Sequence, residues 1–419
     1  MGLHLVMEGT SPDAVDEASD RERFETFAAR NGLRMPRGST ATTPEEVRRA
    51  VHEIGYPVLI RPSYVLGGRG MEILSNDKQL DAYMGEAYLA PDRPLLIDEY
   101  LGNAIELDVD AVCDGDEVLV GAIMEHLEEA GIHSGDSTCF IPPQNIAENV
   151  LAEVEDWTKR IGVELGIRGC FNIQYAIRDE VLYVLEVNPR GSRTFPFVAK
   201  ATGVPLARIA ARLAIGDKLA DLDVPVPQTD AVCVKAPVFP FIKLRGLDPA
   251  PGPEMKSTGE VMGSHARASA AYLKARLATE LPVPVEGGVY ITVKDGDKLG
   301  IIDEARRLQE MGFTLYATRG TAHVLRDVGG LDVQTCYRIA ERRSPDALDL
   351  MRQGKIHLII NTPRSTGGAV LDGNMMRRLA VELNIPFVTT MAGAHMEVEA
   401  IAEAMNGMPE PRLLEIGSL

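Results

Sequence analysis

Short apolar runs and alternating apolar and polar positions fill the first 240 or so residues, a pattern typical of β-strands. Helical patterns occur between some of them, beginning at the Ser11-Pro12-Asp13 start signal and at Pro44. The first region is therefore predicted to be α+β with mainly antiparallel sheets. The expected strands are 56–63, 71–74, 94–101, 105–114, 117–128, 170–177 and 181–190, with later helices at 151–165 and 268–279.

After the proline-rich joint at 281–284, apolar strands alternate regularly with helices. Such alternation predicts a small, doubly wound parallel α/β sheet, and so a second domain at 281–419 after a first domain at 1–280. The expected strands are 289–293, 313–318, 356–361 and 385–390, and the expected helices are 298–311, 321–328, 368–383 and a last helix ending at 405.

Charge and composition narrow the class of protein. Asp and Glu total 61 against 43 for Lys and Arg, and the net charge of -18 opposes binding to nucleic acid. No apolar run reaches the roughly 20 residues of a membrane helix and the first 20 residues do not resemble a signal peptide, so a cytoplasmic protein without a membrane partner is expected. The five cysteines form no CxxC motif, which predicts reduced and mostly buried thiols.

Polar side chains follow the end of an apolar strand in VLYVLEVNPR, residues 181–190. Alternation places Glu186 and Asn188 on one face, with Leu185 and Val187 turned into the core. A turn at 178–180 would bring Gln174 of the preceding strand beside Glu186. Three oxygen ligands on one face suit Mg²⁺ shared with nucleotide phosphates. From spacing alone, an amphipathic hairpin with one solvated face is the alternative, and polar residues on exposed strand faces are common.

Two glycine-bearing loops offer further polar groups. In RPSYVLGGRG, residues 61–70, Gly67 and Gly68 would let the backbone approach phosphate oxygens while Arg61 donates hydrogen bonds. A tight hairpin with flanking arginines is the alternative. The second loop, EHLEEAGIHSGDS at 125–137, could also be an ordinary surface loop.

In this order, RPSYVLGGRG, EHLEEAGIHSGDS, NIQYAI and LEVNPRGSRTFPF resemble the carbamoyl-phosphate-forming C-terminal half of the carbamoyl phosphate synthetase large subunit, an ATP-grasp enzyme. The resemblance runs from about Gly9 to the C-terminus. It implies an ATP-grasp fold followed by a methylglyoxal-synthase-like allosteric domain. The residues that it assigns to ATP are Arg21, Arg61, Gly67, Gly68, Glu99, Leu101, Glu106, Gly131, Ile132, His133, Ser134, Gln174 and Glu186.

The resemblance also implies a reaction, the phosphorylation of carbamate by ATP. Gln174, Glu186 and Asn188 would hold two Mg²⁺ or Mn²⁺ ions, with Glu186 bridging them, and K⁺ is a further candidate ion. Arg190 and Arg193 would lie near the transferred phosphate, so the expected catalytic residues are Glu186 and these two arginines. The implied partners are the N-terminal section of the large subunit and a glutaminase small subunit, in an oligomer that feeds arginine and pyrimidine biosynthesis.

Strand ends in the second domain carry residues suited to an anion. Because helix N-termini follow the strands of open α/β sheets, a phosphorylated ligand is expected there, although ordinary capping residues would look the same. The resemblance implies a nucleoside monophosphate effector. Methylglyoxal synthase activity is not expected, because Thr362 stands where that enzyme has a catalytic aspartate. The expected effector residues are Lys298, Thr318, Thr321, Asn361 and Thr362.

Three departures from the family limit these expectations. The domain that normally precedes this ATP-grasp core is expected to be missing, together with the bicarbonate-phosphorylating half and the oligomerisation domain. Ala236 stands where the family has an ornithine-binding glutamate, although Glu128 and Asp136 are kept. Arg338 and Pro363 replace a lysine and a threonine of the effector pocket. A non-catalytic regulatory subunit and a different ATP-grasp ligase are the alternative functions.

Overall fold

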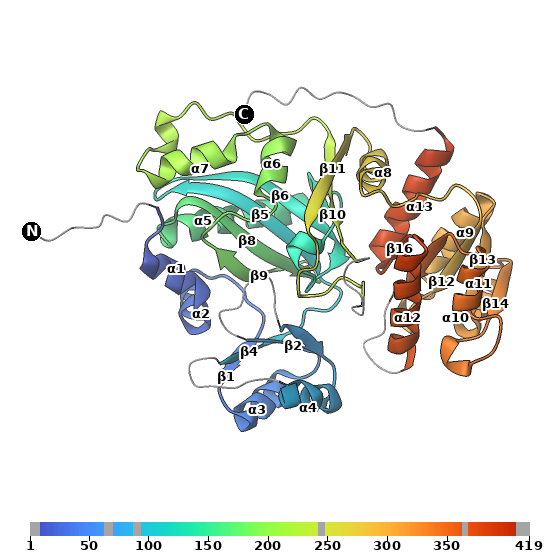
Figure 1. Cartoon of the computed structure of the whole chain (residues 1–419). Coiled ribbons are helices and arrows are strands. Elements are labelled where there is room, and N and C mark those ends of the chain that lie inside the picture. Colours follow the sequence, from blue (N-terminus) through green and yellow to red (C-terminus); the bar gives the residue numbers. More distant parts are fainter. Residues whose placement is uncertain (1–8, 63–69, 87–93, 242–247, 363–367, 408–419) are drawn as a thin grey trace, which may run out of the picture. The chain divides into compact units, whose positions relative to one another are not determined.

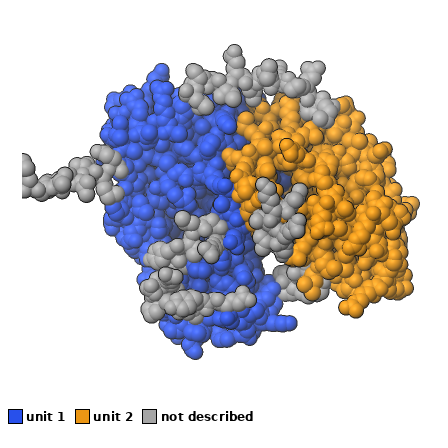
Figure 2. All heavy atoms as spheres, viewed as in Figure 1, with its two compact units in different colours: residues 1–230, 252–255, 413–419 blue, residues 231–251, 256–412 orange. Residues whose placement is uncertain are grey.

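The structure, a computed structural model, describes residues 9–62, 70–86, 94–241, 248–362 and 368–407. Contacts group these residues into two compact units (Figure 2). Of the described residues, unit 1 comprises those up to 230 together with 252–255, and unit 2 comprises those from 231 to 251 and from 256 to 407. The loop glycines Gly67 and Gly68 lie outside the described residues.

A four-stranded antiparallel sheet forms one part of unit 1 (Figure 1). Two helices pack on it and bury a core that includes Val47, Ile60 and Leu80. The first of them begins with a capping box in which Thr43 and Glu46 satisfy each other's backbone N–H groups. In spatial order the strands are β1 (Gly38–Ala41), β4 (Leu95–Glu99), β2 (Val58–Pro62) and β3 (Glu72–Leu74), and the helices are α3 (Pro44–Ile54) and α4 (Asp77–Glu86).

The larger sheet of unit 1 is also antiparallel and has one apolar and one polar face. Leu107, Val109 and Ala111 face a core with helix α5 (Glu148–Glu164), whereas Glu106 and Asp108 point to the other side, as strand alternation requires. The predicted antiparallel architecture is therefore confirmed. Its strands in unit 1 run in the order β7 (Cys139–Ile141), β6 (Val118–Glu129), β5 (Ile105–Asp114), β8 (Arg168–Arg178) and β9 (Val181–Asn188).

Strands β8 and β9 form the predicted hairpin. Asp179 and Glu180 make its two-residue turn with positive φ values of 52° and 61°, the conformation that a tight hairpin turn needs. The register places Gln174 directly opposite Glu186, as expected. A β-bulge breaks the alternation at Leu185, so this residue is half-buried: it packs against a small apolar cluster that includes Leu101 and Ala176, away from the main core, and it also lines a pocket.

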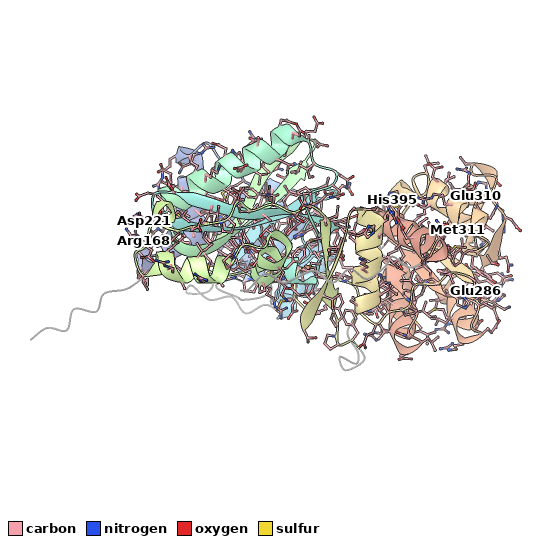
Figure 3. All side chains as sticks on the ribbon, turned by 90° about the horizontal axis from the view of Figure 1, so that it is seen from above. Arg168, Asp221, Glu286, Glu310, Met311 and His395 are labelled. Atoms are coloured by element: carbon pink, nitrogen blue, oxygen red, sulfur yellow. The ribbon has the colours of Figure 1, made fainter. Side chains whose placement is uncertain are left out.

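Helices flank the sheets of unit 1. The start signal at Ser11 produces a helix that ends at Ser19, and a separate helix begins at Arg21, because Asp20 has extended backbone and caps the second helix. The α-helices are α1 (Pro12–Ser19), α2 (Arg21–Arg30), α6 (Phe195–Thr202) and α7 (Leu206–Ala214), and the short 3₁₀ turns are η1 (Ser134–Asp136) and η2 (Leu219–Asp221). Figure 3 labels Arg168, the first residue of β8, and Asp221 in η2.

Unit 2 contains the predicted doubly wound parallel sheet, with five strands in the order β14-β13-β12-β15-β16. The additional strand β14 was not predicted, because its sequence VQTC contains two exposed polar residues and no apolar run. The strands are β12 (Gly288–Thr292), β13 (Thr314–Thr318), β14 (Val333–Cys336), β15 (Leu358–Asn361) and β16 (Phe387–Val388). The helices are α9 (Ile301–Glu310), α10 (Arg319–Asp327), α11 (Ala347–Arg352), α12 (Gly368–Glu382) and α13 (Met391–Met405), with 3₁₀ turns η3 (Asp295–Asp297) and η4 (Ile339–Glu341).

An antiparallel pair and one helix complete unit 2: β10 (Val232–Val238), β11 (Gly259–His265) and α8 (Ala268–Ala278). The helix lies so close to β11 that a Cβ on Gly263 would be 2.2 Å from the carbonyl oxygen of Ala271. Helix α8 also packs against α13, on which Figure 3 labels His395. The domain boundary after residue 280 stays a prediction, since compactness groups α8 with the residues that follow it.

The five cysteines are free thiols, four of them buried. Within the described ranges, no helix combines the length and the apolar character needed to cross a membrane.

Candidate functional site

A pocket of about 650 Å³ opens in unit 1, lined by strands β2 and β4 of the small sheet and by the β8–β9 hairpin of the large one. It brings together predicted residues that are far apart in the sequence, from Arg21 to Arg190. The predicted residues that line it are Arg21, Arg61, Glu99, Leu101, Glu106, Gly131, Ile132, His133, Gln174, Glu186, Asn188 and Arg190. Ser134 and Arg193 are not among the lining residues.

Two arginines give the pocket a cationic side, and they differ in how the protein holds them. The Arg21 guanidinium is buried, with a carboxylate oxygen of Asp98 at 2.8 Å and one of Glu25 at 2.7 Å. The Nε of Arg61 is buried and has no hydrogen-bond partner among the described residues, and its Nη1 lies 3.5 Å from Glu186 Oε2. Nε also lies 3.9 Å from Asp98 Oδ2, too far for a hydrogen bond. A buried donor without a hydrogen bond is costly, so this geometry favours a hydrogen-bond acceptor, such as an anionic ligand, beside Arg61.

Space for the Arg21–Asp98 pair depends on Gly38 of β1, which is paired with Asp98 across the sheet. A Cβ at this position would lie 2.1 Å from Arg21 Nη2 and 2.4 Å from Asp98 Oδ1. Only glycine leaves room for both charged groups. Sequence reasoning missed Asp98 and Gly38, because nothing local in GSTA or LLIDE shows that these strands pair.

Oxygen atoms converge at the end of β9. The amide of Asn188 donates to Glu186 Oε1 at 2.8 Å, and Arg190 donates to Asn188 Oδ1 at 3.1 Å, while Gln174 is the cross-strand neighbour of Glu186. Carboxylate and amide oxygens are hard ligands of the kind that Mg²⁺ takes together with phosphates. Among the described residues there is no group of three or more His, Cys, Asp or Glu side chains that could hold a metal ion.

At the other end of the pocket, Glu99 is fixed by two arginines. Arg37 Nε donates to one carboxylate oxygen at 3.0 Å, and Arg178 donates twice to the other at 3.1 Å. Burial alone would raise the pKa of Glu99, but these hydrogen bonds outweigh it and lower the pKa.

Glu106 is buried and accepts a hydrogen bond from the backbone N–H of Gly131 at 3.0 Å. Burial raises the pKa of Glu106 well above its ordinary value, and although this hydrogen bond lowers it, the carboxylates of Asp108 and Glu186 raise it further. The folded protein therefore keeps this proton at pH values at which the unfolded chain, with a pKa of about 4.3, has lost it.

This shift makes Glu106 a cost to stability that grows as the pH rises above about 4.3. We expect Glu106→Gln to stabilise the ligand-free protein more at pH 8 than at pH 5. Urea unfolding at the two pH values measures the difference. Glu180→Gln, at the exposed hairpin turn, should show no such pH dependence; an equal effect of Glu106→Gln at both pH values would contradict the assignment.

Two hydrogen bonds with other residues of the protein fix the loop around His133. The backbone N–H of Gly135 donates to His133 Nδ1 at 3.0 Å, and His133 N donates to the carbonyl of Gly252 at 3.0 Å. This acceptor role of Nδ1 fits a loop-shaping residue. Arg193, which the family resemblance placed near the transferred phosphate, contacts Met255 Sδ at 2.9 Å. No sequence signal pointed to Gly252 and Met255.

A second, smaller pocket lies at the carboxyl ends of the parallel strands in unit 2. Its lining includes three of the expected effector residues, Thr318, Asn361 and Thr362. Arg338 and Arg377 also line it. Lys298 and Thr321 are not among its lining residues; Thr321 is buried in the first turn of α10. Lys298 lies beside Gly320, since a Cβ on that glycine would be 3.1 Å from Lys298 Nζ. The same Nζ forms an ion pair with Asp295 at 2.6 Å. Pro363 lies outside the described residues.

Family comparisons match both parts of the chain. The model of the carbamoyl-phosphate synthase L chain, ATP binding domain, matches residues 20–222, and that of the MGS-like domain matches residues 300–389. Solved structures with a similar fold include the biotin carboxylase domain of 2-oxoglutarate carboxylase from Hydrogenobacter thermophilus, with a TM-score of 0.53 and 20% identity over 65% of this chain and 67% of that chain. Biotin carboxylase from Campylobacter jejuni has a TM-score of 0.51 and 16% identity, over 64% of this chain and 68% of that chain.

Curated relatives are far more similar in sequence. The carbamoyl phosphate synthase large chain of Methanothrix thermoacetophila is 48% identical over 97% of this chain. The C-terminal section of the same large chain in Methanocaldococcus jannaschii is 47% identical over 95% of it. The chain spans 38% and 66% of the length of these two relatives. With both parts matched in the family's order, the chain belongs to the carbamoyl phosphate synthase large-chain family and corresponds to its C-terminal section.

Proposed function

We propose that this chain phosphorylates carbamate with ATP, giving carbamoyl phosphate and ADP, as the C-terminal part of a carbamoyl phosphate synthetase. The observation that carries the proposal is the pocket in which Arg61, whose Nε makes no hydrogen bond among the described residues, lies beside the oxygen cluster of Gln174, Glu186 and Asn188. That arrangement suits a polyphosphate that needs both cationic donors and a shared cation. High identity to large chains of this synthase over nearly the whole chain supports the same reaction.

In the proposed reaction, an anionic oxygen of carbamate attacks the γ-phosphorus of ATP, and the bond from that phosphorus to the β–γ bridging oxygen breaks. ADP leaves with the electron pair, and no proton must be removed from the nucleophile. Mg²⁺ or Mn²⁺, proposed as two ions at Gln174, Glu186 and Asn188, would neutralise charge on the phosphate oxygens. K⁺ is a further proposed ion.

The side chains of the pocket have separable tasks. Arg61 would donate to phosphate oxygens, and Arg190 and Arg193 would stabilise the charge on the group in transfer. The backbone around Glu99 and Leu101 would hold the adenine. Catalysis would rest on positioning and charge neutralisation in a site that excludes water from the unstable carbamate.

The small pocket of unit 2 is proposed to bind the phosphate of a nucleoside monophosphate effector, at Thr318, Asn361 and Thr362. Lys298 and Thr321 belong to the same proposed site. The proposed partners are the N-terminal section of the large subunit, which would supply carbamate, and a glutaminase small subunit. A cytoplasmic location and an oligomeric assembly also remain proposals.

The reverse reaction tests the function directly. The chain, alone and with an N-terminal section from a split relative, is incubated with carbamoyl phosphate, ADP and MgCl₂, and ATP is measured by a coupled hexokinase assay. We expect ATP formation that depends on both substrates and on Mg²⁺. Binding of ADP without ATP formation in either mixture would favour a non-catalytic subunit and overturn the proposal.

A further inference from the structure

Residues 248–256, here named the strap, are the second part of the connection from β10 to β11 and belong to both compact units. Asp248, Ala250 and Lys256 group with unit 2, whereas Gly252 and Met255 group with unit 1. The strap is therefore one covalent segment with its ends in one unit and its middle in the other. It contacts Arg377 in unit 2, and His133 and Arg193 in unit 1.

At its first residue the strap is held by a buried arginine. Arg377 of α12 is 3% exposed and donates to Asp248 through both Nε, at 2.9 Å, and Nη2, at 2.5 Å. Burial alone would raise the pKa of Asp248, but these bonds and the charge of Arg377 outweigh it and lower the pKa. This two-pronged geometry is the strongest form of an Arg–carboxylate pair.

The same guanidinium reaches the small pocket of unit 2. Arg377 Nη1 donates to Asn361 Oδ1 at 2.5 Å, and Arg377 itself lines the pocket. Gly373, one turn earlier on α12, leaves the necessary space, because a Cβ there would lie 2.8 Å from Nη1. Arg377 thus joins the strap to a residue proposed to bind an effector phosphate.

The strap is braced internally. Lys256 Nζ donates to the backbone carbonyls of Asp248 at 3.2 Å and Ala250 at 2.8 Å. The backbone N–H of Ala250 donates back to Asp248 Oδ1 at 3.0 Å. Because these bonds tie both ends together, movement of Asp248 would be passed to the residues between them.

In its middle, the strap touches groups beside the nucleotide pocket. Gly252 accepts from His133, Pro253 lines the pocket, and Met255 Sδ is 2.9 Å from Arg193 Nη1. Met255 packs closely there: a Cβ on Gly135 would be 3.1 Å from its sulfur. The thioether is a weak acceptor but a well-fitted support for the arginine.

We propose that the strap positions Arg193 and the His133 loop for phosphoryl transfer, and that Arg377 couples it to anion binding beside Asn361. An anion there would accept the hydrogen bond that Arg377 Nη1 now donates to the neutral amide of Asn361. The two hydrogen bonds from Arg377 to Asp248 would stay in place. Arg377 would then bridge the bound anion and Asp248, and the immobilised guanidinium would restrict the movement of Asp248, so the strap would become more rigid. The proposal rests on the proposed function for its catalytic consequence but not for the coupling itself.

Hydrogen exchange of the full chain tests the coupling. Peptides that cover the strap are followed with and without saturating inorganic phosphate, a pyrimidine nucleoside monophosphate or a purine nucleoside monophosphate. We expect at least one of these ligands to slow strap exchange several-fold in the wild-type protein. In Asp248→Asn the ligand should still bind, by calorimetry, within about threefold of wild type but give no strap protection.

Two further variants sharpen this result. Asp248→Glu keeps the charge and should restore part of the protection, whereas Asp332→Asn, at an exposed position in unit 2, should behave as wild type. Equal protection in Asp248→Asn and wild type would overturn the proposal. So would the absence of strap protection by all three ligands in the wild-type chain.

The positioning role has its own readout. Met255→Leu keeps a similar apolar volume but removes the sulfur contact. It should lower kcat for ATP formation about threefold to tenfold, with the KM for ADP and the Tm unchanged. An unchanged kcat would contradict that role. Strap protection in a chain that makes no ATP would instead support the coupling and count against the proposed reaction, so the two failures can be told apart.

Discussion

Glu186→Gln should lower the rate of ATP formation from carbamoyl phosphate and ADP by about a thousandfold. Its carboxylate lies where Arg61, Asn188 and Gln174 converge, and a neutral amide cannot neutralise a cation held between it and the phosphates. Stability should change by no more than about 0.5 kcal/mol, since the side chain is 36% exposed. Steady-state kinetics over a range of Mg²⁺ concentrations, with Tm as the folding check, measures both effects.

The control for this variant is Glu180→Gln, six residues earlier at the turn of the same hairpin. It removes the same charge from the same pair of strands, but at an exposed position away from the pocket. Its rate should equal that of the wild-type chain. If Glu186→Gln kept wild-type turnover, or lost it only together with its fold, the proposed role of Glu186 would be wrong.

Glu397→Gln should destabilise unit 2 by about 3–5 kcal/mol. Glu397 of α13 is fully buried and accepts from Arg276 Nε at 3.0 Å and from the hydroxyl of Tyr272 at 3.0 Å, both on α8. Burial alone would lower the pKa of Arg276, but the charge of Glu397 outweighs it and raises the pKa. Neutralising the carboxylate leaves a cation in the interior without a counter-charge.

Calorimetry of the full chain should show this loss as a fall of roughly 6–20 °C in the transition of unit 2. The matched control is Asp303→Asn, which breaks an exposed ion pair with Arg306 in the same unit and should cost at most about 1 kcal/mol. If the two variants lowered the transition equally, the α8–α13 pair would contribute no more than a surface pair.

Local pattern predicted most elements because strand alternation and helix capping are properties of neighbouring residues. The β8–β9 hairpin is the clearest case: a short turn and a period of two were enough to place Gln174 opposite Glu186. The pattern did not predict the bulge at Leu185 or the polar strand β14, because each departs from the regular alternation of apolar and polar residues in a strand. Family resemblance supplied the other pocket residues, which spacing alone left ambiguous.

By itself, then, the sequence determined the order of the elements, the two fold classes and the oxygen cluster at the end of β9. Only the tertiary structure decided which distant groups meet: Asp98 with Arg21, Asp248 with Arg377, and Glu397 with Arg276. These partners are separated by 77 to 129 residues of chain. No periodicity extends over such distances, because the pairing depends on how whole sheets and helices pack and on which buried charge each packing leaves to be neutralised.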